Sequence, residues 1–279
     1  MTKKILFGID LEEFDIPEEY GQNLPLDIQL KVTLQGLEVL EDLLNKYQVR
    51  VTFFTTAFWA THFPERILLL AKKHEIASHG YYHTSFKRED LLISRDVLTR
   101  VSGQQIQGFR MPRMQEVDLA DLKQAGYTYD SSSHPTYIPG RYSHLKKPKQ
   151  IFIQDGIVEL PVSVSPVFRI PVFWLAFKNF PYKYYIYLCK KILNHHGYLI
   201  LYIHPWEFAD LSSFKLPFIV KRRYGASLRE RTDRLFAYLS ELGRFITHKE
   251  MVNDFLTQTK LNKDPDNPNP NTEQILLLH

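Results

Sequence analysis

The chain has 279 residues, with 35 Lys and Arg against 31 Asp and Glu, which gives a formal net charge of +4. So weak a positive charge does not indicate a nucleic-acid partner. With 44% apolar and 24% charged residues, the composition excludes a disordered chain and suits one large α/β domain. The single Cys189 excludes an internal disulfide framework and a four-cysteine zinc site, so any metal must be held by histidines and carboxylates.

The sequence predicts neither an export signal nor a membrane-spanning segment. The apolar run before Asp10 is too short for the core of a signal peptide. The most apolar long stretch, residues 171–188, is interrupted by Lys178, Pro181 and Lys183. We therefore expect a cytoplasmic protein, and peripheral contact with a membrane remains an open alternative.

Apolar, β-rich runs alternate with segments of helical period, the pattern of a parallel sheet covered by helices. The predicted strands are 5–10, 51–55, 76–79, 107–110, 127–130, 199–204 and 245–247. The predicted helices are 34–47, 64–74, 117–125 and 228–242, and the first carries leucines at spacings of three and four. This order fits either a closed β/α barrel or an open doubly wound sheet.

Three segments depart from the alternation. Residues 151–164 predict a β-hairpin around Asp155-Gly156. Residues 166–188 are dense in aromatics and prolines and predict an irregular cap on the core, with a substrate lid or a membrane-facing surface as alternatives. The polar, Pro-rich end of the chain predicts disorder. We expect one domain at 1–259, with the aromatic cap at 165–190 and a disordered tail at 260–279.

Polar residues follow several predicted strands, where functional groups of parallel α/β folds gather. His79 and His83 are four residues apart, a spacing that can place two imidazoles on one metal ion, although ordinary core or surface histidines show it too. Asp10 and Glu12 point to the same side if the first strand stays extended. One carboxylate could then bind a metal while the other takes a proton from water.

Two further strand ends carry groups that suit such a site. Arg110, stiffened by Pro112, could orient Asp10, or it could form a surface salt bridge. His204 ends the most apolar strand of the C-terminal half and could act as a general acid tuned by Asp130, or be a hydrogen-bonded core histidine. The basic residues of 221–231 could meet a pyrophosphate or anionic headgroups, although a solvated face is the favoured interpretation.

In this order the motifs resemble the polysaccharide deacetylase family, also called the NodB-homology or carbohydrate esterase family 4 group. The similar segments are the His79-x-x-x-His83 pair, Arg110-Met-Pro112-Arg113 and Leu201-Tyr-Ile-His204-Pro205, and the resemblance runs from Ile5 to Phe255. Tyr129-Asp130-Ser131-Ser132 and His204-Pro205-Trp206-Glu207 are similar to a branch found in exopolysaccharide and surface-glycan biosynthesis. The resemblance implies an irregular (β/α)7 barrel of the NodB-homology type as the catalytic domain.

The resemblance also implies roles for individual residues. His79 and His83 would bind a divalent metal, most often Zn²⁺ in this family. Asp10 would be the general base and His204 the general acid, with Arg110 orienting Asp10. Relatives usually have a second aspartate next to the first as the third metal ligand, but Leu11 stands there, so Glu12 is the predicted ligand. Asp130 completes the predicted catalytic residues, and the predicted substrate-binding residues are Tyr82, Pro112 and Trp206.

The expected function is metal-dependent removal of an N-acetyl group from an amino sugar or glycan precursor in surface polysaccharide biosynthesis. The expected partner is an N-acylated sugar, a nucleotide-linked sugar or a lipid-linked glycan. Alternatives are a deformylase or amidohydrolase of another non-peptide amide, and an inactive glycan-binding homologue. The departure at Leu11 mildly favours the last of these.

Overall fold

The computed structural model describes residues 2–262. Its main sheet has nine strands, arranged in the order β10-β1-β2-β3-β4-β5-β9-β8, with β11 also paired to β1. The strands are β1 (Lys4–Leu11), β2 (Thr52–Thr55), β3 (Glu75–Ser78), β4 (Gly108–Phe109), β5 (Tyr129–Asp130), β8 (Phe152–Gln154), β9 (Ile157–Glu159), β10 (Tyr198–Ile203) and β11 (Arg244–Ile246). All neighbours pair in parallel except β8 and β9, which form the predicted hairpin.

The parallel sheet curls back on itself. Beyond β9, the amide of Ser163 donates to the carbonyl of Ile200 in β10 at 3.0 Å, and the amide of Ile200 donates to Oγ of Ser163 at 2.9 Å. These two bonds connect the far end of the sheet to the strand at its other edge. The seven parallel strands from β10 to β9 therefore form the irregular (β/α)7 barrel that the resemblance implied.

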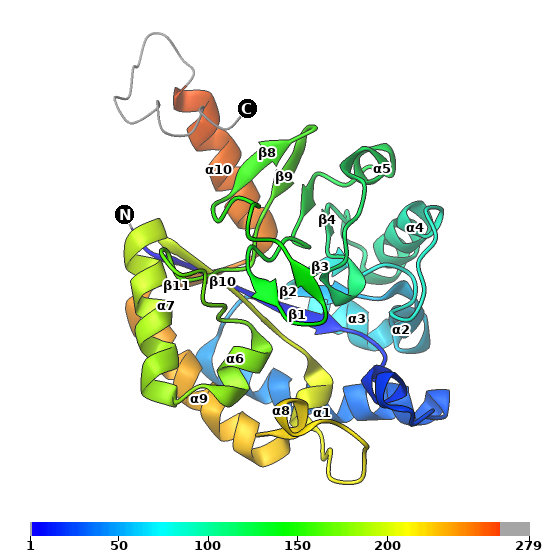
Figure 1. The fold of residues 1–279 in the computed structure, drawn as a ribbon. Coiled ribbons are helices and arrows are strands. Elements are labelled where there is room, and N and C mark those ends of the chain that lie inside the picture. Colours follow the sequence, from blue (N-terminus) through cyan, green and yellow to red (C-terminus); the bar gives the residue numbers. More distant parts are fainter. Residues whose placement is uncertain (1, 263–279) are drawn as a thin grey trace.

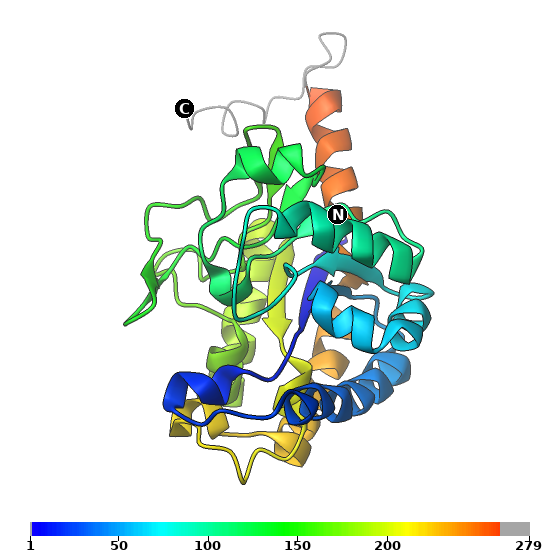
Figure 2. The same cartoon turned by 90° about the vertical axis from the view of Figure 1, so that its right-hand side faces the viewer.

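Helices cover the outside of the curled sheet (Figure 1). They are α1 (Leu26–Tyr47), α2 (Ala57–His62), α3 (Pro64–Ala71), α4 (Asp90–Ser102), α5 (Leu119–Gln124), α6 (Trp174–Asn179), α7 (Tyr182–His196), α8 (Phe218–Lys221), α9 (Gly225–Leu242) and α10 (His248–Asn262). Three short 3-10 helices, η1 (Ile16–Tyr20), η2 (Pro112–Met114) and η3 (Pro205–Phe208), and a small hairpin of β6 (Tyr137–Ile138) and β7 (Tyr142–Ser143) complete the described elements. Figure 2 shows α1, α3 and α4 on one side of the sheet and the long connection after β5 on the other.

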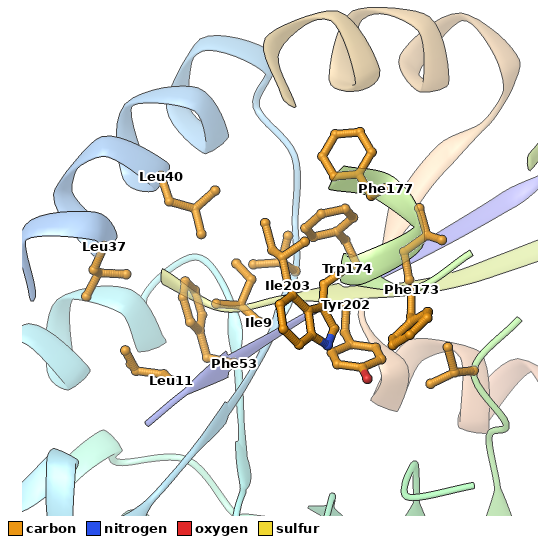
Figure 3. Packing of buried hydrophobic residues seen from close by; sticks show 14 of the residues in the cluster. Ile9, Leu11, Leu37, Leu40, Phe53, Phe173, Trp174, Phe177, Tyr202 and Ile203 are labelled. Atoms are coloured by element: carbon orange, nitrogen blue, oxygen red, sulfur yellow. The ribbon is translucent and has the colours of Figure 1, made fainter. Parts of the chain in front are cut away.

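The side chains on the two faces of β1 pack into different apolar clusters. Ile9 and Leu11 belong to the apolar cluster shared with Leu37 and Leu40 of α1 (Figure 3). The alternate residue Leu6 belongs to the second cluster, which fills the barrel interior. Because side chains alternate along a strand, Asp10 and Glu12 follow Leu6 to the inner face.

Several sequence predictions are corrected by the structure. The segment 165–190 is not an irregular cap, because most of it forms α6 and the first part of α7. Helix α1 begins at Leu26 rather than at residue 34, and α10 continues to Asn262, into the predicted tail. The rest of that tail lies outside the described residues. None of the helices in residues 2–262 is long and apolar enough to cross a membrane, and the single domain at 1–259 stays a prediction.

Candidate active site

A small cavity of about 70 Å³ opens where β1, β3 and β10 end. That volume holds an acyl group or a few water molecules, so a larger substrate must extend out of the mouth. Its lining combines acids and histidines with aromatic and basic side chains. The lining residues are Asp10, Glu12, Ile16, Glu19, His79, His83, Arg113, Met114, Ile138, Arg141, Tyr142, Phe173, Trp174, Leu175, Tyr202, His204 and Trp206.

Glu12, His79 and His83 converge at the base of this cavity. Oε2 of Glu12 lies 3.1 Å from Nε2 of His79 and 3.1 Å from Nε2 of His83. One ligand atom from each residue lies within 4.8 Å of the others. Zinc ligands at about 2.1 Å in a tetrahedral arrangement stand roughly 3.4 Å apart. The spacing of these three atoms therefore fits one metal ion.

The other ring nitrogen of each histidine is already engaged. Nδ1 of His79 donates to the carbonyl oxygen of Arg110 at 2.8 Å. Nδ1 of His83 lies 2.7 Å from Oδ1 of Asp15. Such contacts fix the ring orientation and leave Nε2 to face the metal position. Asp15 is thus a supporting carboxylate rather than a ligand in the cluster, a role that the sequence analysis missed.

The electrostatics of the cluster favour a cation. Burial disfavours the charged form of His83, but the carboxylates of Glu12 and Asp15 raise its pKa to about 9. Burial also opposes the charged form of Glu12, yet His83 and His204 hold the pKa of Glu12 below its ordinary value. The field that attracts a proton to His83 attracts a metal ion in the same way.

Asp10 lies beside this cluster and is held by Arg110. Nη1 of Arg110 donates to Oδ1 of Asp10 at 2.6 Å, and Nε donates to the carbonyl of Ser131 at 3.1 Å. The guanidinium is fully buried and packs over the ring of Phe54 at 3.9 Å. A Cβ at Gly8 would lie 2.6 Å from Nη1, so only glycine leaves room for this arginine. The predicted contact between Arg110 and Asp10 is confirmed.

His204 faces the cavity from the end of β10. Its Nε2 lies 3.9 Å from Oδ2 of Asp10 and 3.9 Å from Oε1 of Glu12. Its Nδ1 lies 3.0 Å from Oε1 of Glu207, whose Oε2 lies 3.2 Å from Nζ of the fully buried Lys178. Burial opposes the charged form of His204, but Glu12 and Glu207 raise its pKa.

The prediction that Asp130 tunes His204 is wrong, because Glu207 is the carboxylate that contacts it. Oδ1 and Oδ2 of Asp130 accept hydrogen bonds from the hydroxyl and amide of Ser132, at 2.5 and 3.0 Å. Asp130 also does not line the cavity. The sequence signal for Glu207 was its place three residues after His204, where it caps the 3-10 helix η3 by accepting from the amide of His204 at 2.9 Å.

Of the predicted substrate-binding residues, only Trp206 lines the cavity. Its Nε1 donates to Oε1 of Glu12 at 3.1 Å, and its ring stacks on His204 at 4.9 Å. Tyr82 packs against Phe58 with 39% of its surface exposed, away from the cavity. Pro112 is buried and begins η2, so it shapes the turn after Arg110 rather than the cavity wall.

The cavity mouth carries a charged rim that the sequence analysis did not identify. Arg113 donates to Asp15 at 2.9 Å, to the carbonyl of His83 at 2.6 Å and to Glu19 at 2.9 Å. Arg141, from the β6–β7 hairpin, donates to the other oxygen of Glu19 at 2.8 Å. Arg113 and Met114 adopt positive φ values of 57° and 55°. Backbone strain of this kind concentrates at functional sites.

Two protein-family models match parts of the chain. Residues 35–129 match the family model for polysaccharide deacetylase, and residues 131–253 match the model of a domain of unknown function (DUF3473). The match to the polysaccharide deacetylase model covers 95 of the 279 residues, from before β2 to the start of β5. The pairing of the two models is typical of the exopolysaccharide-associated branch. A search of curated proteins finds no match.

Solved structures share the fold. A protein from Mycobacterium smegmatis designated a polysaccharide deacetylase is 22% identical, with a TM-score of 0.61 over 93% of this chain and 92% of that one. A protein from Pseudomonas aeruginosa PAO1, also designated a polysaccharide deacetylase, is 17% identical, with a TM-score of 0.60 over 90% and 89% of the two chains. The Puue allantoinase is 15% identical, with a TM-score of 0.60 over 90% and 89%.

Proposed function

We propose that this protein is a hydrolase that removes an N-acetyl group from an amino sugar or glycan precursor, with the help of a divalent metal ion. The observation that carries the proposal is the convergence of Glu12, His79 and His83 beside Asp10 and His204 in one cavity. The products would be acetate and a free amino sugar.

The donor set suits a divalent ion such as Zn²⁺, since two imidazole nitrogens and one carboxylate leave a coordination position free for substrate or water. Glu12, His79 and His83 would hold the ion. When bound, the ion would supply Lewis acidity, which polarises a carbonyl oxygen and lowers the pKa of a water molecule. Nε1 of Trp206 donates a hydrogen bond to Oε1 of Glu12, so this carboxylate offers only Oε2 to the ion.

Asp10 would be the general base. Arg110 holds its Oδ1, and Oδ2 faces the space between Asp10 and His204. An attacking water placed there would lose its proton to Oδ2. Arg110 orients the acceptor oxygen and needs no contact with substrate.

His204 would be the general acid. Nδ1 of His204 donates to Glu207, and the neighbouring acids raise the pKa of His204, so the imidazolium form carries a second proton on Nε2, which faces the cavity. Cleavage of the C–N bond leaves an amine nitrogen that needs a proton, and His204 would donate it from Nε2. The packed rings of Trp174 and Trp206 fix the imidazole and keep bulk water from this position.

The biosynthetic setting of the proposal follows from the family branch. A cavity of this size accepts the acyl group, while the sugar lies at the mouth against the aromatic wall. We propose a nucleotide-linked or lipid-linked sugar precursor, handled on the cytoplasmic side, as the substrate. Chromatography of reaction mixtures made with each precursor type distinguishes the two.

The first experiment is metal analysis of the protein purified without added zinc, with the His79→Ala/His83→Ala variant beside it. We expect about one metal ion per chain, absent from the variant. Acetate release from N-acetylated sugars is then measured, with formate and ureide hydrolysis assayed in parallel. A protein that takes up no metal even from supplied zinc would contradict the proposal.

The role of His204 is tested with His204→Gln. We expect turnover to fall by about 100-fold or more, because the leaving nitrogen loses its proton donor, while the metal content stays unchanged. His62→Gln, which replaces an exposed histidine on α2, is the matched control. A His204→Gln variant with the wild-type rate would remove His204 from the mechanism.

A further inference from the structure

Two segments of the chain lack acidic residues altogether. Residues 160–206 and 211–229 contain ten Lys and Arg and no Asp or Glu. The other residues therefore hold 25 of the 35 Lys and Arg against all 31 Asp and Glu. The small net charge of the chain conceals a basic part and an acidic part.

The first segment presents two apolar side chains to solvent. Val167 and Phe168 are 77% and 82% exposed at the tip of a tight loop. The loop is held together at its base, where the amide of Ser165 donates to the carbonyl of Ile170 at 2.9 Å and Val164 bridges to Pro171. These bonds fix the conformation of the loop and so hold Val167 and Phe168 in their exposed positions.

Two cations, Lys149 and Arg169, lie beside this tip. Nζ of Lys149 bonds the carbonyl of Pro166, and Arg169 follows Phe168 directly. Nη1 of Arg169 donates to the carbonyls of Pro135 and Lys147, at 3.1 and 2.9 Å. Val167 and Phe168 therefore form an exposed apolar pair with basic side chains beside it.

The second segment repeats this arrangement on α8. Phe218 and Ile219 are 76% and 50% exposed in the first turn of α8. Three consecutive cations, Lys221, Arg222 and Arg223, follow them, and the Arg222 guanidinium lies 5.9 Å from the Phe218 ring. The two apolar pairs with their adjacent cations are called the loop tip (167–168) and the α8 tip (218–219).

Both tips adjoin the wall of the active site. The loop tip leads directly into Phe173 and Trp174, which line the cavity. The α8 tip is tied to the other end of α6, because Nδ2 of Asn179 donates to the carbonyl of Ile219 at 2.8 Å. Helix α6 packs against both α7 and α8, and Figure 1 shows the three helices next to one another.

We propose that the loop tip and the α8 tip form a docking surface for a membrane that contains anionic lipids. Exposed apolar and aromatic side chains followed by Lys and Arg, in segments of the sequence that contain no Asp or Glu, are the features that bind the interface of an anionic bilayer. The cations meet the headgroups while the apolar tips enter the acyl boundary. Docking holds the cavity mouth at the lipid surface, and it does not depend on the proposed reaction.

The test is flotation of the full chain with vesicles of phosphatidylcholine containing about one third phosphatidylglycerol, a composition that offers the negative surface potential required. We expect co-flotation at low salt, weaker at 0.5 M NaCl, and none with phosphatidylcholine alone. The Phe168→Ser/Phe218→Ser variant should lose at least about fivefold in the bound fraction, because it removes the inserting side chains.

Leu68→Ser/Leu69→Ser is the matched control, since these two leucines are 50% and 51% exposed on α3. It should float as the wild type does, and all three proteins should show the same circular dichroism spectrum and metal content. Equal flotation of the two double variants would overturn the proposal. So would a wild-type protein that binds no vesicle, or a self-association in solution that only Phe168→Ser/Phe218→Ser abolishes.

Discussion

Lys178 is a fully buried cation on α6 that faces a fully buried Glu207. Burial lowers the pKa of Lys178 and opposes the charged form of Glu207, but the ion pair and His204 hold the Glu207 pKa below its ordinary value. The pair thus keeps a carboxylate beside His204 in an interior that would otherwise favour its neutral form. Removing one member leaves the other as an uncompensated buried charge.

We predict that Lys178→Met lowers the free energy of unfolding by about 3 kcal/mol, because Glu207 loses its partner. Urea unfolding measures the change. Lys183→Met, on the exposed face of α7, is the control and should shift stability by less than about 0.5 kcal/mol. The double variant Lys178→Met/Glu207→Gln should regain part of the loss, and strictly additive effects would contradict this coupling.

At the scale of residues, strand ends and side-chain alternation located the centre of the site. Asp10 and Glu12 could be placed on one face because the first strand alternates, and the structure brings Glu12 to the two histidines. Asp15 and Glu207 were not assigned, since their roles depend on loop and 3-10 geometry that has no period in sequence. Tyr82 was misplaced because adjacency to a motif does not fix the direction of a side chain.

At the scale of elements, α1 crosses η3 with unusually little space between the two backbones. A Cβ at Gly36 would lie 1.8 Å from the carbonyl oxygen of Pro205. Glycine at this point of α1 lets the helix rest directly on the turn after His204. The same close approach holds Trp206 against the cavity.

We predict that Gly36→Ala lowers the free energy of unfolding by about 2 kcal/mol, because overpacking of backbone against backbone outweighs the better helix propensity of alanine. Catalytic turnover should fall with it, since η3 must shift. Gln35→Ala, at a neighbouring position of α1 away from this contact, tests the propensity effect alone. An increase in the melting temperature of Gly36→Ala would contradict the close contact.

The pairing of β5 with β9 places two acids opposite each other, Asp130 and Glu159. Burial, and then the nearby Asp130, raise the pKa of Glu159 to about 9, and burial raises the pKa of Asp130 to about 6. A carboxyl whose pKa is higher in the folded state binds more protons when folded. Its contribution to stability is therefore full below about pH 4.5 and is lost as the pH rises towards about 9.

We predict that Glu159→Gln reduces this loss. The difference in unfolding free energy between variant and wild type should grow in favour of the variant as the pH rises from 5 to 9. Urea unfolding at several pH values measures it, with Glu65→Gln on the exposed side of α3 as control. A difference that does not change with pH would show that Glu159 is already ionised in the folded protein.

Most strands could be predicted as elements, because short, continuous apolar runs such as that of β10 are typical of strands buried on both faces. Helices α6 and α7 could not, because their aromatic and prolyl neighbours obscure the helical period. Helix α4 was missed because few of its residues are buried, which leaves little hydrophobic contrast. Closure of the sheet depends on contacts between Ser163 and Ile200, which no local pattern predicts.

At the scale of the whole molecule, the proposed metal site of Glu12, His79 and His83 joins elements that are distant in sequence. Glu12 follows β1, and His79 and His83 follow β3, so an ion held by all three links both strands only in the folded chain. A ligand that binds only the folded state stabilises it by mass action.

We predict that zinc at about 100 times its dissociation constant stabilises the protein by about 2.7 kcal/mol, a rise in melting temperature of roughly 5 °C. Differential scanning fluorimetry measures the shift, and a chelator should reverse it. The His79→Ala/His83→Ala variant should show no shift, whereas His62→Gln should respond as the wild type does. An equal response of both variants would place zinc elsewhere.

The indole of Trp206 bonds the carboxylate of Glu12, and the ring of Trp174 lies 5.6 Å from that of Trp206. The chain has three tryptophans, and the third, Trp59, is buried in α2. A charge that arrives at Glu12 changes the electric field at an indole that touches it, so intrinsic fluorescence is an optical reporter of site occupancy. With Trp59→Phe, all tryptophan emission comes from Trp174 and Trp206 in the cavity wall, and titrations of metal or substrate need no label.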